Sequence, residues 1–388
     1  MISKRASSIS PSLVFSILEK AQKLQASGID IINFSVGEPD FSTAEYIITA
    51  AKKAMDTGKT KYTATGGVEP LRQAICEKLK KDNGLQYSPD QIIVSNGCKQ
   101  SLDNALACLV DPGDEVILFS PYWLTYPELV KICGGTPVIV ECDAANNYFP
   151  TAEQLEKAIT PKTKVILLNT PCNPSGAVYP EKVIRELAAV IEKTDAYVIS
   201  DEIYEKLIYD GTKHYSIAAY SKKLYEKTIV INGFSKAFAM TGWRVGYLAA
   251  SPKIAKAVIA FQSHVTQNIN TPAQYAAIEA LSNKQGDTVL KQMIAEFKKR
   301  AEYLISRLEK MPHISFTRPR GAFYVLIDVT KLGDAFEIAS QLLEKAHIAV
   351  VPGDPFGAGG TVRLSYALGM EEITKGMNRL EEFLLSCK

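Results

Sequence analysis

The 388-residue sequence predicts an α/β protein with a mostly parallel sheet and a second, smaller α+β part. Two observations predict this fold class. Between about residues 90 and 250, short runs rich in valine and isoleucine alternate with helical patterns. After about residue 290, a long charged helical pattern leads into three further strand-like runs. The first observation indicates repeated strand–helix–strand units, and the second indicates a separate packing unit.

Seven apolar runs are the candidate strands of the large sheet. Uniform apolarity over so few residues is typical of strands that helices cover on both faces. Helical spacing in the intervening segments, such as 181–193, supplies the covering helices. The runs are QIIVSNG, DEVILFSP, TPVIVEC, KVILLNTP, AYVISDEIY, TIVINGF and RVGYLAAS.

The smaller part begins with the charged amphipathic segment KQMIAEFKKRAEYLISRLEKM, which predicts a long helix. The strand-like runs GAFYVLIDV, HIAVVPG and TVRLSYA follow, with a helical pattern after the first of them. The helical pattern before residue 40 could complete this part.

Composition excludes several classes of protein. Lys plus Arg (44) against Asp plus Glu (42) is too balanced for a nucleic-acid binder. The seven cysteines are scattered without a Cys-x-x-Cys pair, which is typical of reduced thiols. No stretch approaches the roughly eighteen uncharged residues of a membrane span, and the N-terminus makes a poor signal peptide. We therefore expect a soluble cytoplasmic protein that binds a small molecule, with neither nucleic acid nor membrane as a partner.

Lys236 is a candidate nucleophile in the small-residue stretch 231–247, which follows an apolar strand. A desolvated lysine has a lowered pKa, and its neutral amine attacks an aldehyde. The alternative is a surface lysine at a turn, which is the better interpretation of Lys236 taken alone.

Residues at other strand ends change that balance. Asp201 ends one apolar run, Tyr204 follows it, and Asn173 follows the preceding strand. Open parallel sheets bind ligands at the carboxyl ends of their strands. Asp201 could hold a pyridine nitrogen protonated, while Tyr204 and Asn173 could donate to a phenolate oxygen. The alternatives are a helix N-cap for Asp201, a packed phenol for Tyr204 and a turn former for Asn173.

The segment 92–106 passes from an apolar strand through a small turn into an amphipathic helix. Such a turn points backbone N–H groups at an anion, usually a phosphate. Gly97, Cys98 and Lys99 are the candidates, and a turn that binds nothing is the alternative.

Beyond these features, the sequence resembles the class I pyridoxal-phosphate aminotransferases of fold type I, in the branch of the bacterial aspartate aminotransferases. The resemblance spans nearly the whole chain and rests on the order and spacing of many segments. They are SVGEPDF (35–41), KYTATGGVEPLR (61–72), SNGCKQ (95–100), DPGDEVILFSPYW (111–123), NTPCNPSGAVYP (169–180), SDEIYE (200–205), SKAFAMTGWRVGY (235–247), PRGAFYVLID (319–328), VVPG (350–353) and VRLSYA (362–367).

The resemblance implies an enzyme that uses pyridoxal 5′-phosphate to exchange amino groups between aspartate and 2-oxoglutarate. It implies a large domain over residues 42–292 with a seven-stranded sheet, a small domain of residues 1–41 and 293–388, and a homodimer with shared active sites. The alternatives are an aminotransferase for aromatic amino acids, alanine or prephenate, and a lyase, decarboxylase or synthase on the same scaffold. We expect no fused DNA-binding module, because SVGEPDF already occurs at residue 35.

The resemblance also implies residue roles around the cofactor. Lys236 matches the lysine that holds it as a Schiff base, and Asp201 matches the partner of its ring nitrogen. Tyr204 and Asn173 match the donors to its phenolic oxygen, and Trp123 matches the ring stacked on its face. The remaining cofactor contacts, mostly with the phosphate, match Gly97, Cys98, Ser235, Arg244 and, from the neighbouring subunit, Tyr62.

For the substrate, Arg363 matches the residue that grips the α-carboxylate, a task that suits a guanidinium fork. A structural ion pair is the alternative for this arginine. Lys99 matches a lysine that reads the distal carboxylate in one branch of the family. The other substrate contacts match Gly37, Ser12, Asn173 and Trp123, and no metal site is expected.

Three features of the sequence limit these roles. Gly233 stands where many members have a serine that touches the phosphate, and Val14 stands where relatives usually have threonine. The segment 261–270 lacks the arginine that reads the distal carboxylate in the other branch. Since a lysine is a point charge on a flexible stem, Lys99 is expected to accept a dicarboxylate less strictly than a bidentate arginine would.

Overall fold

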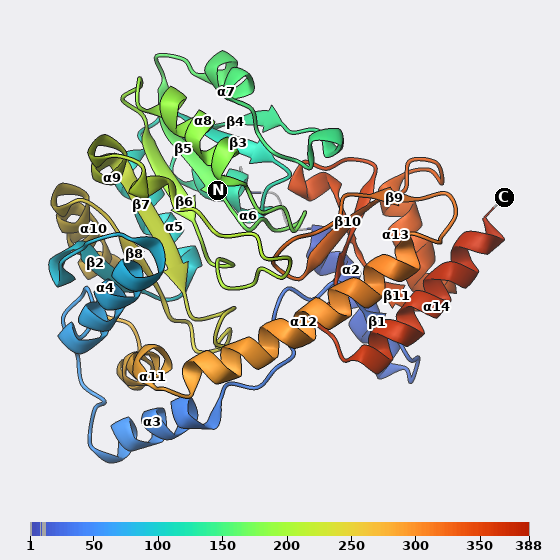
Figure 1. Ribbon diagram of the computed structural model, residues 1–388, viewed down its shortest axis with the longest axis horizontal. Helices are drawn as coiled ribbons and strands as arrows, with labels where there is room; N and C mark the ends of the chain where they lie inside the picture. Colours follow the sequence, from blue (N-terminus) through green and yellow to red (C-terminus); the bar gives the residue numbers. More distant parts are fainter. Residues whose placement is uncertain (1, 8, 10–12, 388) are drawn as a thin grey trace.

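A seven-stranded sheet forms the centre of the larger part of the protein, whose computed structural model describes residues 2–7, 9 and 13–387 (Figure 1). The strands are β2 (Ile92–Ser95), β3 (Glu115–Ser120), β4 (Thr136–Glu141), β5 (Thr163–Asn169), β6 (Tyr197–Asp201), β7 (Thr228–Gly233) and β8 (Gly246–Ala249). Their order is β2-β8-β7-β6-β5-β3-β4. β8 is antiparallel to both neighbours, and the other pairs are parallel. All seven predicted strands and the mostly parallel sheet are confirmed.

Helices cover both faces of this sheet. They are α3 (Glu45–Asp56), α4 (Glu69–Asn83), α5 (Cys98–Leu109), α6 (Thr125–Ile132), α7 (Ala152–Ala158), α8 (Glu181–Ile191), α9 (Lys222–Lys227), α10 (Pro252–Val265) and α11 (Thr271–Ser282), with the short 3₁₀ turns η1 (Pro89–Gln91), η2 (Ala144–Asn146) and η3 (Ile217–Ala219). Successive strand residues point to opposite faces. Thus Leu118 packs in a core with α5, α6 and α10, whereas Ile117 packs in a core with α7 and α8. Two buried faces explain why the strand sequences are apolar throughout.

The smaller part contains a four-stranded sheet in the order β12-β13-β10-β9 and a parallel pair, β1 with β11. The strands are β12 (Val351–Pro352), β13 (Thr361–Ser365), β10 (Tyr324–Asp328), β9 (Ser315–Phe316), β1 (Ile32–Asn33) and β11 (Ile348–Ala349). The helices are α2 (Leu13–Ala26), α13 (Ala335–Lys345) and α14 (Met370–Ser386), with the turn η4 (Asp354–Phe356). The short helix α1 (Lys4–Ser7) contacts α6 of the larger part. The run HIAVVPG is divided between β11 and β12, because Ala349 pairs with β1 and Val351 pairs with β13.

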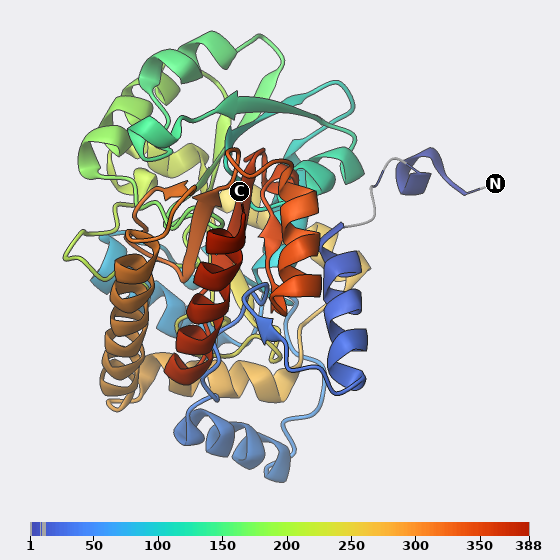
Figure 2. The same ribbon diagram turned by 90° about the vertical axis from the view of Figure 1, so that its right-hand side faces the viewer.

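Helix α12 (Gly286–Leu308) connects the two parts, since it begins beside α11 and later packs against α14. Figure 2 shows α12, α14 and α13 side by side on the outside of the smaller part. One hydrophobic core joins Ile32 and Phe34 with residues from Met293 onward, and Tyr204 reaches into it from the larger part. This core supports the division at residues 42 and 292, which stays our proposal. None of the described helices is long and apolar enough to cross a bilayer.

Candidate active site

The candidate residues gather where the parallel strands end. Asp201 is the last residue of β6, and its register partner Asn169 is the last residue of β5. Asn169 Nδ2 donates to the Asp201 carbonyl oxygen at 3.1 Å, and Asn169 Oδ1 accepts from the Asn173 N–H at 3.1 Å. Two neighbouring strand ends therefore fix the turn that carries Asn173.

Asp201 is a buried acid, and none of the described lysines or arginines forms a hydrogen bond or ion pair with it. Its Oδ2 accepts from the Tyr126 hydroxyl at 2.7 Å, and its Oδ1 accepts from the Ile203 N–H at 3.2 Å. Burial raises the pKa of the Asp201 carboxyl to about 6, against the lowering effect of these two hydrogen bonds. No helix begins at this residue, so the N-cap alternative is wrong.

Lys236 extends from the segment after β7 toward the same edge of the sheet. Its Nζ donates to the Gly37 carbonyl oxygen and lies 5.7 Å from the ring centres of Tyr204 and Phe323. Burial of the amine among these groups lowers the pKa of Lys236 to about 8. The side chain is therefore not a solvated lysine at a surface turn, and part of the amine population is neutral near pH 7.

Arg363, on β13, is a cation buried without a carboxylate partner among the described residues. It is 5% exposed, and its Nε has no hydrogen-bond partner. Nη1 donates to Asn173 Oδ1 at 3.0 Å, and Nη2 donates to the Ser35 carbonyl oxygen at 2.8 Å. The expected alternative, a structural ion pair, is not formed. Because an unpaired buried charge is costly, this arrangement is typical of a site that binds an anion.

Tyr324 joins the two halves of this site. Its ring centre lies 4.5 Å from the Arg363 guanidinium carbon, and its hydroxyl lies 2.9 Å from the Tyr204 hydroxyl. Burial raises the pKa of Tyr204 well above its usual range, so its hydroxyl stays neutral and able to donate. Sequence analysis assigned no separate role to Tyr324, although it lies in the motif PRGAFYVLID, or to Tyr126, whose position in a helix resembles that of an ordinary core residue.

The turn before α5 forms the candidate anion cradle. Gly97 caps the helix with φ +77°, and a Cβ there would lie 2.6 Å from Arg244 Nη2. Arg244 is therefore held directly against the turn, where its Nη1 also donates to the Thr241 carbonyl oxygen at 2.8 Å. A helix N-terminus beside an exposed guanidinium provides N–H donors and positive charge, which suit a phosphate.

Lys99 and Trp123 lie at the same end of the site, with the Lys99 Nζ 5.0 Å from the Trp123 ring centre. The Trp123 ring packs edge-on against Tyr126, whose hydroxyl donates to Asp201. Burial, and then the charge of Arg244, lowers the pKa of Lys99.

The three remaining predicted residues are Ser235, Tyr62 and Ser12. Ser235 is buried beside Lys236. Tyr62 is 83% exposed and lines a separate cavity, although Asn270 lines both that cavity and the one containing Arg244. Ser12 lies outside the described residues.

Known proteins are similar to this chain in sequence and in fold. The family model for aminotransferase class I and II matches residues 29–380. The chain belongs to the class I and II aminotransferase family. The predicted family is thereby confirmed.

Relatives of this aminotransferase match it over almost its whole length. The aspartate aminotransferase of Bacillus sp. (strain YM-2) is 43% identical over 99% of both chains. The aspartate/prephenate aminotransferase of Thermus thermophilus is 41% identical over 99% of this chain and 98% of its own. The solved structure of the Thermus thermophilus aspartate aminotransferase with maleate has a TM-score of 0.95 at 41% identity, covering 99% of this chain and 100% of that one. The predicted fold is confirmed as well.

The departure at Gly233 has a structural reason in this aminotransferase. A Cβ on Gly233 would lie 2.8 Å from Cys98 Sγ and 2.9 Å from Gly246 Cα. Cys98 therefore occupies the space that a serine side chain at position 233 would need. Burial raises the pKa of the Cys98 thiol well above its usual range, so the sulfur is an uncharged space-filling group.

Gly246 packs so closely on the cradle that an alanine is expected to destabilise this aminotransferase by about 1–3 kcal/mol. A Cβ there would lie 2.5 Å from the Gly97 carbonyl carbon, so backbone would have to move. The measurement is the free energy of unfolding in urea. The control is Gly242→Ala, since a Cβ on Gly242 meets nothing within 4 Å. Equal stability of the two variants would contradict this packing argument.

Proposed function

We propose that this aminotransferase uses pyridoxal 5′-phosphate and moves the amino group of L-aspartate to 2-oxoglutarate, giving oxaloacetate and L-glutamate. The observation that carries the proposal is the buried guanidinium of Arg363, which has no carboxylate partner among the described residues. Its positive charge also helps to lower the pKa of the Lys236 amine. Relatives named aspartate aminotransferase, 42–43% identical over 99% of this chain, support the choice of aspartate.

The residues of the site fit this cofactor. The buried Asp201 carboxylate, with which none of the described lysines or arginines forms an ion pair, suits a protonated ring nitrogen. The cradle at Gly97, which any Cβ would fill, suits a phosphate. When bound, the cofactor supplies an aldehyde that captures amines and a conjugated ring that delocalises an electron pair. The residues that would hold it are Lys236, through its amine, and Tyr204, Asn173, Trp123, Gly97, Cys98, Ser235, Arg244 and the partner's Tyr62.

The protein's own groups then divide the work. Arg363 binds the substrate α-carboxylate through its guanidinium fork, which fixes the orientation of the α-carbon. The Lys236 amine, with its pKa lowered to about 8, accepts the proton from that carbon and returns a proton during the reverse half of the cycle. Lys99 faces the distal carboxylate, with Trp123, Asn173, Gly37 and Ser12 as the remaining substrate contacts.

Incubation with L-aspartate and 2-oxoglutarate is expected to yield oxaloacetate and L-glutamate in equal amounts. Pyruvate, ammonia or carbon dioxide as the primary product would instead identify a lyase or decarboxylase. Lys99→Met is expected to lower kcat/KM for aspartate by about 10- to 100-fold, because the distal carboxylate loses a charged hydrogen-bond donor. L-alanine, which lacks that carboxylate, is the control substrate and should be little affected. An equal loss for both amino acids would place Lys99 outside the specificity site.

Prephenate is a second candidate acceptor. Four relatives at 40–41% identity are named aspartate/prephenate aminotransferase, two of them as probable. Supplying prephenate in place of 2-oxoglutarate, with aspartate as donor, tests this function directly.

We further propose a homodimer in the cytoplasm. Support for the dimer is the 83% exposure of Tyr62, an aromatic side chain whose cavity adjoins the Arg244 cavity through Asn270. The seven free cysteines support a reducing compartment. A monomer in sedimentation that is fully active would rule out a site shared between subunits.

A further inference from the structure

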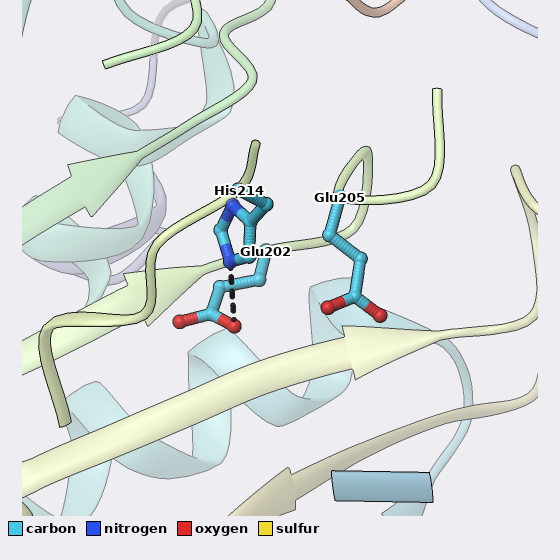
Figure 3. A group of neighbouring side chains, drawn as sticks. All are labelled: Glu202, Glu205 and His214. Atoms are coloured by element: carbon cyan, nitrogen blue, oxygen red, sulfur yellow. Dashed lines mark ion pairs between the residues drawn. The ribbon is translucent and has the colours of Figure 1, made fainter. Parts of the chain in front are cut away.

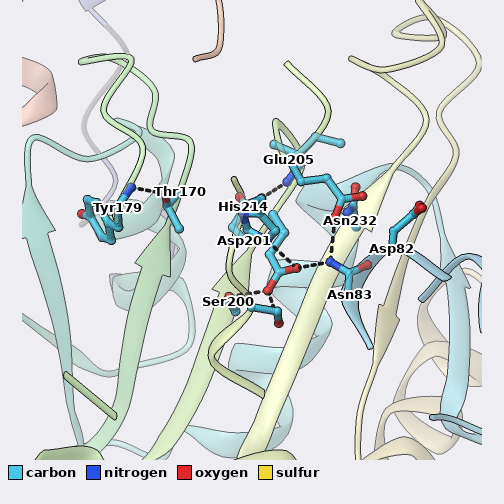
Figure 4. A network of polar contacts seen from close by, with 12 residues as sticks. Asp82, Asn83, Thr170, Tyr179, Ser200, Asp201, Glu205, His214 and Asn232 are labelled. Atoms are coloured by element: carbon cyan, nitrogen blue, oxygen red, sulfur yellow. Dashed lines mark hydrogen bonds and ion pairs between the residues drawn. The ribbon is translucent and has the colours of Figure 1, made fainter. Parts of the chain in front are cut away.

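A buried network of charged side chains lies behind the segment 201–205, and no role described above uses it (Figures 3 and 4). Asp201 and Tyr204 face the candidate site, whereas Glu202 and Glu205, on the same segment, contact side chains of α4. Two acids and two site residues therefore share five consecutive positions. The contacts of these acids decide how the site residues are held.

Glu202 is fully buried and bound from three segments of the chain. Its Oε1 accepts from Ser200 Oγ at 2.9 Å and from Ser216 Oγ at 2.6 Å. Its Oε2 lies 3.0 Å from His214 Nε2 and accepts from Asn83 Nδ2 at 3.3 Å. The dashed line in Figure 3 marks the pair with His214. A carboxylate with this many partners cannot rotate without breaking several contacts, so the backbone at Glu202 is pinned.

Glu205 completes the attachment to α4. It forms an ion pair with Lys78. It also accepts from Asn83 Nδ2 at 2.8 Å, a contact that can be followed in Figure 4. Burial opposes its charge, but Lys78 and His214 outweigh burial and lower the pKa of Glu205 to about 2. Beside it, Lys206 pairs with Asp82 at 2.8 Å. Glu205 is therefore ionised at neutral pH.

The charges of the network balance only when His214 is protonated. Glu202, Glu205 and Asp82 carry three negative charges, and Lys78 and Lys206 carry two positive ones. Burial alone would lower the pKa of His214, but Glu202 and Glu205 outweigh it and raise that pKa. The other titratable groups that feel Glu202 are Tyr87, Tyr247 and Asp201. Burial keeps both tyrosines neutral, so neither supplies the missing charge.

A metal ion is not needed for this balance. Ligand atoms of Glu202, Glu205 and His214 lie within 4.8 Å of one another. The Lys78 ammonium and the Asn83 amide already donate to the two carboxylates, however. Protein donors thus occupy the positions where a cation would bind.

We propose that His214 and Glu202 form a positioning pair, in which the His214 imidazolium anchors Glu202 and cancels its negative charge behind Asp201. The inference rests on the proposed function, because it concerns Asp201 as the partner of the cofactor ring. Glu202 lies next to Asp201 in the chain, and its charge raises the pKa of that carboxyl. Without the imidazolium, no positive charge of His214 would offset the negative charge of Glu202 beside Asp201 and the bound cofactor.

The test compares His214→Gln, Glu202→Gln and the double variant. Glutamine at position 214 keeps an N–H donor but removes the positive charge. In the loaded enzyme, His214→Gln is expected to raise the pH of the cofactor's absorbance transition by roughly 0.5 to 1 unit, since an uncompensated negative charge favours protonated groups nearby. The double variant, which removes both charges, should return within about 0.2 unit of the unmodified protein. A purely structural role predicts a double variant at least as perturbed as either single one, and that result would overturn the inference.

A second measurement needs no cofactor, and its deciding result comes from the unmodified protein. The chain has only four histidines, so NMR titration of the cofactor-free protein can follow each ring. His214 should stay protonated above the usual value of about 6.5, and its titration should move down in Glu202→Gln. A His214 that titrates at or below about 6.5 in the unmodified protein overturns the pair, whether or not the variants fold.

The two proposals fail in different ways. Absence of any cofactor chromophore in the unmodified protein defeats the proposed function, and the NMR titration still decides the charge state of His214. A normal chromophore whose transition does not move in His214→Gln defeats the positioning pair alone.

Discussion

Lys236→Ala is expected to abolish turnover of aspartate, by at least about 10⁴-fold, while the protein remains folded. The amine of Lys236 is the proposed anchor of the cofactor and the group that moves the α-proton, so no step survives its removal. Among the described residues, its amine has one hydrogen bond, to the Gly37 carbonyl oxygen, so the fold loses little. Single-turnover kinetics measure the loss, and circular dichroism measures the folding. Borohydride reduction should give a mass adduct on Lys236 that the variant lacks.

Lys227 provides a matched control. Burial also lowers the pKa of Lys227 to about 8, and its Nζ donates to the carbonyl oxygens of Ile191 and Thr194, away from the candidate site. Lys227→Met is expected to reduce stability by about 1–3 kcal/mol and to leave kcat of the folded protein unchanged. Retention of more than about 0.01% of activity in Lys236→Ala, against the expected loss of at least about 10⁴-fold, would refute the assigned role.

Arg363→Met is expected to lower kcat/KM for aspartate by on the order of 10²- to 10³-fold, because the α-carboxylate loses its bidentate partner in a buried site. The effect on stability should have the opposite sign. Since Arg363 is a buried cation without a carboxylate partner among the described residues, its removal relieves a desolvation cost. Urea unfolding of the cofactor-free variant should therefore show equal or higher stability.

Arg300 is the control for this second expectation. It is equally buried, but its guanidinium pairs with Asp40 at 2.6 Å and with Glu296 at 3.1 Å. Arg300→Met should therefore cost about 1–3 kcal/mol of stability. If Arg363→Met destabilises the protein as Arg300→Met does and leaves kcat/KM intact, Arg363 is a structural residue.

The large sheet was predictable because covered strands carry an unambiguous apolar signal. The direction of β8 was not, since a strand with two buried faces is apolar whether it runs parallel or antiparallel. The division of HIAVVPG at Val350 was hidden for a similar reason. An apolar run shows that a segment is buried but not which strand it pairs with.

The residues of the site that lie within recognisable sequence motifs were predictable. Lys236, Asp201 and Arg363 each lie in a recognisable segment, and the structure brings them together. Contacts between segments could not be predicted from those segments alone. The hydrogen bond from Tyr126 to Asp201 spans 75 positions, and that between Tyr204 and Tyr324 spans 120. The role of Tyr62 stays a prediction.

Helix α12 is an unbroken rod of 23 residues, about 35 Å long at the usual rise per residue. Through Arg300 it grips Asp40, only three positions beyond Gly37, and through Arg307 it grips Glu381 of α14 at 2.7 Å. A rod of that length turns a tilt of about 5° at one end into a displacement of about 3 Å at the other. The chain around Asp40 and helix α14 are thus both tied to α12, through arginines seven positions apart, so a tilt of this helix would carry both with it.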